Sequence, residues 1–235
     1  MKPRALLLHG GPGLPDYLDP LPEELAPLFD LDRYTQGRHL DVPAFVVEAL
    51  DHLRAPSWIV GHSWGGYLGL HVAATAPDRV LGLVLIGSLG AVGDGGWEAA
   101  GPRLVSRLTD DERAALERAQ PGEGLAIVWP GYFSHRELAP PYPGWRTDPE
   151  VLESIYAWVQ EHGSELAPAL AGLDLPVLIL HGTCDHIPLE PVQATAALLP
   201  GAELHVLEGI GHFPWLERPG IVHDAAVDFV SSRSS

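Results

Sequence analysis

Short apolar runs alternate with segments of helical periodicity along most of the chain, which has 235 residues. Each run is short and mostly bounded by Gly, Pro or Asp, as strands buried in a parallel sheet usually are. The runs predict strands at Ala5–Leu8, Leu31–Thr35, Ser57–Val60, Leu81–Ile86, Val177–Leu180 and Glu203–Leu207. Strands that alternate with helices form βα units, so the pattern indicates the α/β class with a mainly parallel sheet and flanking helices.

Apolar residues recur with a period near 3.6 in three further segments, which we expect to be helices with one buried face. These stripes are Val46, Val47, Leu50 and Leu53 after Asp41; Tyr67, Leu68, His71, Val72 and Thr75 after Trp64; and Ile221, Val222, Ala225, Ala226 and Phe229 near the end.

The segment between the fourth and fifth predicted strands has no good strand pattern. Residues 109–112, Thr-Asp-Asp-Glu, form a capping box. Asp148 followed by Pro149 is a typical helix start, and Gly163 is expected to end that helix. Because a structureless loop of this length is improbable, we expect residues 90–166 to form an inserted helical cap.

The composition of the chain excludes several kinds of binding partner and site. The chain carries 14 Lys and Arg residues against 31 Asp and Glu, a formal net charge of −17. This charge disfavours binding to nucleic acid or to an anionic membrane. The single cysteine, Cys184, excludes an internal disulfide and a multi-cysteine metal site. No apolar run is long enough for a signal peptide or a membrane span, so we expect a cytoplasmic protein.

The strongest chemical motif is Gly-His-Ser-Trp-Gly-Gly at residues 61–66, directly after an apolar run and directly before a helical pattern. This is the G-x-S-x-G turn in its proper strand–turn–helix context. Such a turn forces Ser63 into a strained backbone conformation that lifts its hydroxyl above the sheet. The sequence therefore predicts Ser63 as a nucleophile.

A serine nucleophile needs a base and a carboxylate that orients the base. Asp185 follows the fifth predicted strand and His212 follows the sixth, and both would lie beyond the carboxyl ends of the strands, where such sheets keep their sites. We predict that His212 is the general base and that Asp185 fixes its tautomer. Asp94, after the preceding strand, is the alternative acid.

Neighbouring residues that could compete for these roles have simpler interpretations. We expect His186 to point away from the site, because it is adjacent to Asp185 in the chain. His62 should pack beneath the nucleophile, and His71 should be a hydrogen-bonded core residue. Cys184 is expected to be a small buried side chain.

The glycine-rich segment His-Gly-Gly-Pro-Gly at residues 9–13 follows the first strand. It lets the backbone approach a substrate closely, so we predict an oxyanion hole made by the amides of Gly11 and Trp64. The segment lacks the lysine and the spacing of nucleotide-binding loops, and no H-E-x-x-H motif occurs. We expect no cofactor and no metal.

Taken together, these residues resemble the α/β-hydrolase fold superfamily over essentially the whole chain. The motifs at 9–13 and 61–66, with Tyr132-Phe133 in the cap, are similar to the prolyl iminopeptidase (proline aminopeptidase) branch. The resemblance implies an acyl-enzyme mechanism with the triad and oxyanion donors predicted above. It also implies a hydrolase core at residues 1–89 and 167–235.

Three features depart from that branch. Trp129 stands where the branch has an acidic residue that binds the substrate's amine. Residues 35–39, Thr-Gln-Gly-Arg-His, are at best a remnant of an Asp-Gln-Arg-Gly-x-Gly-x-Ser segment. The chain starts almost on its first strand, so the antiparallel amino-terminal hairpin should be abbreviated.

Cap aromatics should determine substrate choice, and Trp129, Tyr132 and Phe133 are the predicted substrate-binding residues. Their apolar area favours a small hydrophobic or aromatic acyl group, carried by a small molecule or a short peptide. The sequence thus predicts a serine hydrolase that cleaves a small ester or amide through an acyl-Ser63 intermediate, with aminopeptidase-like activity first. The alternatives are a carboxylesterase, a carbon–carbon bond hydrolase and a non-catalytic binding protein of the same fold.

Overall fold

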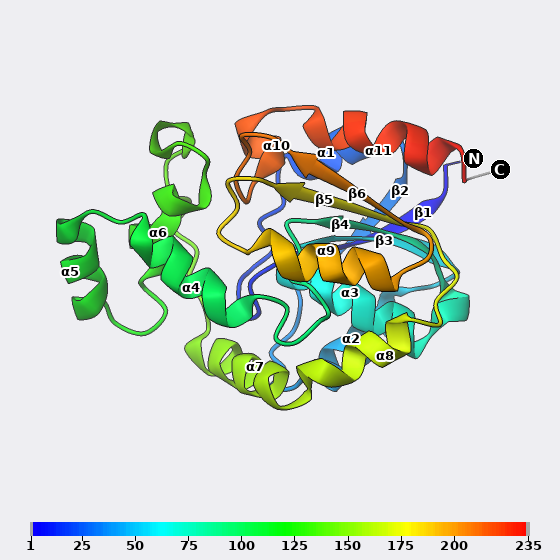
Figure 1. Ribbon diagram of the computed structural model, residues 1–235, viewed down its shortest axis with the longest axis horizontal. Helices are drawn as coiled ribbons and strands as arrows, with labels where there is room; N and C mark the ends of the chain where they lie inside the picture. The colour runs from blue at the N-terminus through cyan, green and yellow to red at the C-terminus, as the bar shows by residue number, and fades with distance from the viewer. Residues whose placement is uncertain (1, 234–235) are drawn as a thin grey trace.

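A six-stranded sheet in the order β2-β1-β3-β4-β5-β6 runs through the centre of the computed structural model, which describes residues 2–233 (Figure 1). All neighbouring strands pair in parallel. The strands are β1 (Arg4–Leu8), β2 (Asp30–Arg33), β3 (Ser57–His62), β4 (Val80–Ile86), β5 (Val177–Gly182) and β6 (Ala202–Leu207).

The predicted α/β class and all six predicted strands are confirmed, with bounds that differ by no more than two residues at an end. Every residue of β3 and of β5 is buried, whereas the edge strands β2 and β6 are partly exposed. The apolar runs were readable because central parallel strands are covered on both faces. Among the described residues, β1 is the first strand.

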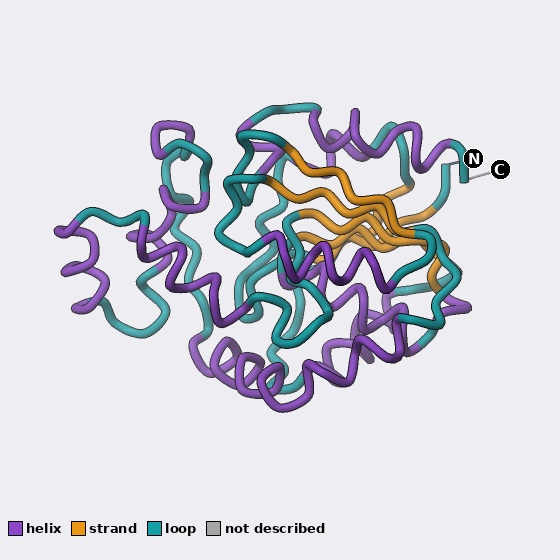
Figure 2. Tube along the Cα trace, viewed as in Figure 1, coloured by secondary structure: helices purple, strands orange, loops and turns teal. Residues whose placement is uncertain are grey.

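Helices cover both faces of the sheet (Figure 2). Successive strand residues point to opposite faces, so β1 sends Leu6 and Leu8 into one apolar cluster and Ala5 and Leu7 into the other. The flanking helices are α1 (Leu21–Leu25), α2 (Val42–His52), α3 (Trp64–Thr75), α8 (Leu166–Leu170), α9 (Leu189–Leu198), α10 (Pro214–Glu217) and α11 (Ile221–Ser231), with a 3-10 turn at Pro77–Arg79.

The predicted helical stripes are confirmed as helices, with two corrections to individual side chains. Val47 on α2 is 59% exposed, so it does not belong to the buried face of that helix. His71 on α3 is not hydrogen-bonded, because its Nε2 is buried without a partner. Burial lowers the pKa of His71 to about 4, which keeps the ring neutral.

Helices also make up the insertion between β4 and β5, as far as the structure describes it. They are α4 (Trp97–Ser106), α5 (Asp110–Arg118), α6 (Leu125–Val128) and α7 (Pro149–His162), with 3-10 turns at Trp129–Tyr132, Arg136–Leu138 and Gly163–Glu165. Helices α4 to α6 project to one side of the body, whereas α7 lies along it (Figure 1). The division into cap and core at residues 90 and 166 stays a prediction.

The starts of the two insertion helices predicted from the sequence are as expected. Thr109 and Glu112 form the complete capping box of α5. The Asp148 carboxylate accepts hydrogen bonds from the amides of Glu150 and Val151 at the start of α7. At the other end of α7 the backbone of Gly163 is right-handed, with φ −56°, so the chain continues directly into a 3-10 turn and α8.

Asp148 also ties α7 to the body of the protein. Its backbone N–H donates to the carbonyl of Gly13 at 2.9 Å. Its carboxylate accepts a hydrogen bond from Arg38 Nε at 2.8 Å, and Arg38 also pairs with Glu150. The start of α7 is therefore held against the loop that follows β1.

No helix within residues 2–233 is long and apolar enough to cross a membrane.

We expect Gly65→Ala to destabilise the fold by roughly 2–4 kcal/mol. A Cβ at Gly65 would lie 2.1 Å from the carbonyl oxygen of Leu8, so α3 would have to move away from β1. Gly69→Ala on the same helix is the matched control, because its Cβ would meet only an Ile59 methyl group at 3.1 Å. Urea unfolding of both variants measures the difference, and equal stabilities would contradict this account of the packing.

Candidate active site

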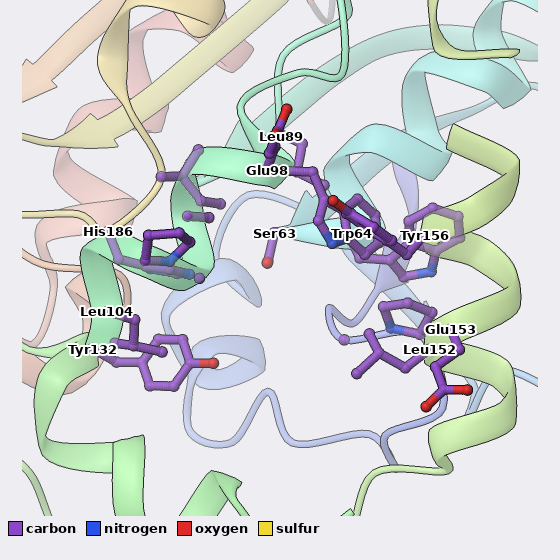
Figure 3. A pocket seen from close by; sticks show the side chains of 17 residues that line it. Ser63, Trp64, Leu89, Glu98, Leu104, Tyr132, Leu152, Glu153, Tyr156 and His186 are labelled. Carbon is purple, nitrogen blue, oxygen red and sulfur yellow. The ribbon is translucent and has the colours of Figure 1, made fainter. Parts of the chain in front are cut away.

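Ser63 occupies the strained turn that the sequence predicts. Its φ is +56° and its ψ is −122°, and it is the only non-glycine with positive φ among the described residues. The Ser63 N–H donates to the carbonyl of Ile86 at 2.9 Å, which ties the turn to β4. Figure 3 shows the Ser63 hydroxyl directed into an open cavity.

Two glycines make this turn sterically feasible. A Cβ at Gly61 would lie 2.4 Å from the carbonyl oxygen of Gly65. A Cβ at Gly10, on the neighbouring loop, would lie 2.7 Å from Cβ of Ser63. Because glycine has no Cβ, the strand, the helix and the loop after β1 can all approach the serine closely.

Asp185 and His212 form a buried pair beyond the carboxyl ends of β5 and β6. Nδ1 of His212 lies 2.9 Å from Oδ2 and 3.0 Å from Oδ1 of Asp185. Oδ1 also accepts a hydrogen bond from the amide of Ile187. Burial alone would raise the pKa of Asp185, but the charges and hydrogen bonds of His212 and His186 outweigh it and hold that pKa well below its usual range.

Surrounding backbone fixes this pair tightly. The His212 N–H donates to the carbonyl of Tyr132 at 2.8 Å, so the insertion contributes to its position. Gly87 has φ +50°, and a Cβ there would lie 3.0 Å from Oδ2 of Asp185 and 3.1 Å from Nδ1 of His212. The pair therefore leaves no room for a side chain at the end of β4.

His186 does not point away from Asp185, and the prediction that it does is wrong. Its Nδ1 lies 2.9 Å from Oδ1 of Asp185, although too poorly aligned for a regular hydrogen bond. Its ring also lies 4.5 Å, centroid to centroid, from the ring of His212. Burial and the nearby His212 lower the pKa of His186 to about 4, so its ring is neutral at pH 7.

His62 packs beneath the site, as predicted, and it makes two hydrogen bonds there. Its Nε2 lies 2.8 Å from the carbonyl oxygen of His212 and must donate to it. Burial, with the nearby His212, lowers the pKa of His62 well below its usual range, so the ring carries one proton. Nδ1 therefore accepts from the Tyr17 hydroxyl at 2.7 Å. No sequence pattern predicts this role for Tyr17.

Gln36 is a second residue whose role no sequence pattern predicts. It lies within residues 35–39, the possible remnant of the Asp-Gln-Arg-Gly-x-Gly-x-Ser segment. Its side-chain N–H donates to the carbonyl of His9 at 2.6 Å, and its Oε1 accepts from the Trp64 indole at 3.0 Å. Gln36 thus joins the loop after β1 to the residue that follows Ser63.

The two predicted oxyanion donors, the amides of Gly11 and Trp64, belong to residues that line the same cavity as Ser63. Trp64 begins α3, and Gly11 has φ +60° in a turn closed by a hydrogen bond from Leu14 to its carbonyl. In the described part of the chain neither amide has a hydrogen-bond partner. Both N–H groups are available for a ligand.

A cavity of about 530 Å³ opens over Ser63. Most of its wall is apolar or aromatic, and Glu98 and Glu153 stand on its rim (Figure 3). The residues that line it include Gly11, Ser63, Trp64, Leu89, Trp97, Leu104, Tyr132, Leu152, Tyr156 and His186. A smaller cavity of about 70 Å³ shares Ser63 and is also lined by His212.

The predicted substrate-binding residues separate into different places. Tyr132 lines both cavities, and Trp129 lines only the smaller one. Phe133 lines neither: it is buried and stacks on Phe213 at 5.6 Å. The prediction for Phe133 is therefore wrong, because its ring points into the core beneath the insertion.

Two further candidates lie outside this site. Asp94 accepts hydrogen bonds from the amides of Gly96 and Glu98 at the start of α4, so it is not the acid that meets His212. Cys184 is only half-buried, not fully buried as expected, and lines a separate cavity of about 280 Å³ with Arg107.

The described residues contain one cluster with the composition of a metal site. Ligand atoms of Asp185, His186 and His212 lie within 4.8 Å of one another. Nδ1 of His186 and Nδ1 of His212 each lie 2.9 Å from an oxygen of Asp185, so the carboxylate faces both rings. The two cavities share Ser63 and Gly11; Trp64 lines the larger one and His212 lines the smaller one. A serine hydroxyl, a buried imidazole–carboxylate pair and two free amides around these adjoining cavities are the groups that nucleophilic acyl transfer requires.

Comparisons with known proteins find relatives over most of the chain. A model of the alpha/beta hydrolase family matches residues 5–225. A pimeloyl-(acyl-carrier protein) methyl ester esterase of Xanthomonas oryzae pv. oryzae (strain MAFF 311018) is 32% identical over 249 residues, covering 98% of this chain and 96% of the relative. A 2-hydroxymuconate semialdehyde hydrolase of Pseudomonas putida is 30% identical over 195 residues, covering 79% of this chain and 65% of that protein.

Solved structures show the same fold. A thermophilic esterase from Thermogutta terrifontis, with malate bound, has a TM-score of 0.72 and 23% sequence identity. The match covers 100% of this chain and 92% of that chain. At this level of identity the likeness concerns the fold alone.

Asp185→Asn should lower stability by about 1–3 kcal/mol at pH 7, because it removes the charge that the two imidazoles face. In the unfolded chain an aspartate titrates near pH 3.9. The depressed pKa of folded Asp185 therefore contributes stability above about pH 4, and this contribution is lost as the pH falls further. Urea unfolding at pH 7 and pH 3 should show a smaller gap between wild type and variant at pH 3, and an equal gap would contradict the ionised carboxylate.

Proposed function

The chain belongs to the alpha/beta hydrolase family, and on that premise we propose that it is a serine esterase that cleaves a small carboxylic ester through an acyl-Ser63 intermediate. The observation that carries this proposal is the strained Ser63, whose hydroxyl faces a cavity that His212, paired with buried Asp185, also borders. The relatives support the reaction class, since they are named as an ester esterase and a semialdehyde hydrolase.

The proposed reaction begins with attack of Ser63 Oγ on the ester carbonyl while His212 Nε2 takes the hydroxyl proton. Asp185 holds the opposite ring nitrogen, Nδ1, and stabilises the imidazolium that forms. The amides of Gly11 and Trp64 donate to the oxyanion of the tetrahedral intermediate, and each such donor typically contributes about 10²–10³ in rate.

Collapse of that intermediate breaks the bond between the acyl carbon and the alcohol oxygen. His212 returns its proton to the departing alcohol, which leaves the acyl group on Ser63. Water then attacks the acyl-enzyme with His212 as base, and a second collapse releases the carboxylic acid and restores Ser63. Every group in this scheme belongs to the chain, the ester or water.

Apolar walls and a volume of about 530 Å³ favour a small or medium hydrophobic acyl group. An aminopeptidase is the second candidate, because Glu98 and Glu153 on the rim of the cavity could bind an ammonium group. The resemblance to the prolyl iminopeptidase branch thus stays a prediction. Carbon–carbon bond cleavage is a third possibility, motivated by the Pseudomonas putida relative.

A fluorophosphonate probe should label the wild-type protein once, on Ser63, as read by intact-mass and peptide mass spectrometry. Ser63→Ala should lose the label and more than about 10⁴-fold in kcat, because no other group replaces the nucleophile. Ser106→Ala, an exposed serine on α4, is the matched control and should label like wild type. A protein that stays unlabelled while a control hydrolase reacts would point to the non-catalytic alternative.

Turnover of p-nitrophenyl esters with acyl chains of graded length should exceed that of proline p-nitroanilide by at least about 100-fold in kcat/KM. The expected optimum is a short or medium chain, because longer chains outgrow the cavity. Faster turnover of the anilide would instead favour the aminopeptidase. In that case Glu98→Gln and Glu153→Gln should raise the KM for the anilide while leaving the KM for esters unchanged.

A further inference from the structure

Two chemically different walls enclose Ser63 (Figure 3). His186 and Tyr132 lie on one side of the serine, whereas Trp64, Leu152 and Tyr156 lie on the other. The second wall is largely apolar, and α3 and α7 supply it. The first wall presents a ring nitrogen and a phenol, and neither of these is used by the reaction scheme above.

Contacts with Asp185, Tyr132 and His212 fix the orientation of the His186 ring. Its Nδ1 lies 2.9 Å from Oδ1 of Asp185, and its ring makes edge contacts with Tyr132 at 4.7 Å and His212 at 4.5 Å between centroids. The two nitrogens of an imidazole point in widely different directions, so Nε2 faces away from Asp185. The ring lines both cavities, and within residues 2–233 its Nε2 makes no hydrogen bond.

The protonation of His186 follows from the same contacts. Its lowered pKa, about 4, leaves one proton on the ring at pH 7. A lone pair on Nδ1 would be repelled by the carboxylate 2.9 Å away, so the proton resides on Nδ1. Nε2 is therefore an acceptor without a donor, at the edge of the substrate cavity.

Tyr132 adds a second polar group to this wall. Figure 3 shows its hydroxyl directed into the open centre of the cavity. The hydroxyl makes no hydrogen bond within the described chain, and the centroid of the ring lies 5.5 Å from that of the His212 ring. The backbone carbonyl of Tyr132 accepts the His212 N–H, so the position of this side chain is tied to the base itself.

The reaction determines which part of the substrate meets this wall. His212 gives its proton to the departing alcohol, so the alcohol portion must lie beside His212 and the acyl chain must extend elsewhere. We propose that His186 and Tyr132 form a subsite for the alcohol portion and select an ester whose alcohol carries a further hydroxyl or N–H donor. The acyl chain then lies along the apolar wall. This inference rests on the proposed esterase function.

The test compares 2-hydroxyethyl butyrate with propyl butyrate, which have the same number of non-hydrogen atoms and differ by a hydroxyl in place of a methyl group. Wild type should prefer the hydroxyethyl ester by about 5–10-fold in kcat/KM, because the added donor meets Nε2 of His186. His186→Phe keeps an aromatic ring at this position and removes the acceptor, so the ratio should fall to about 1. Tyr132→Phe should lower the ratio in part.

Tyr156→Phe is the matched control, because it removes a phenol from the opposite, apolar wall. Its ratio of the two esters should equal that of wild type. His186→Gln, which retains an acceptor, should restore part of the preference. Should His186→Phe fail to fold, as judged by thermal unfolding, Tyr132→Phe decides: a fall of at least about twofold in the ratio supports the subsite, and an unchanged ratio overturns it.

The possible failures are distinguishable. Hydrolysis of both butyrates with a wild-type ratio near 1, or a preference that persists in His186→Phe, overturns the subsite and leaves the esterase intact. Absence of turnover with either butyrate and with every p-nitrophenyl ester overturns the proposed function and this inference with it.

Discussion

A steric constraint at Ser63 determines the rest of the site. The left-handed backbone of this residue is strained for any side chain, and it persists only because the surroundings hold it. The hydrogen bond from the Ser63 N–H to the carbonyl of Ile86 holds it to β4, and the glycines around it let β1, β3 and α3 approach within contact. The same close approach brings Gly11 beside the serine.

The parallel sheet places Asp185 and His212 near Ser63 without further strain in the backbone. Strands β3, β5 and β6 all end at the same edge, so the loops that carry Ser63, Asp185 and His212 meet there although they lie far apart in the chain. The insertion completes the site from above, since Tyr132 fixes His212 through the backbone and lines the cavity with its ring. Residues of the sheet loops and of the insertion thus both fix the position of the His212 imidazole.

Much of this arrangement could be read from the sequence, because strong local patterns carry it. Fully buried strands show as apolar runs, and the turn at Ser63 has a motif whose spacing is dictated by sterics. The errors concern side-chain directions, which no local pattern encodes. His186 faces Asp185 and Phe133 faces the core because of contacts with distant segments, and the roles of Tyr17 and Gln36 likewise depend on partners remote in the chain.

The attachment of α7 has a mechanical consequence. Asp148 caps this helix, pairs with Arg38 and donates its backbone N–H to Gly13, two residues from the amide of Gly11. Displacing the start of α7 would therefore also displace the loop that carries Gly11, which lines the cavity with Ser63. The wall of the cavity that α7 supplies and the position of the loop after β1 thus depend on each other.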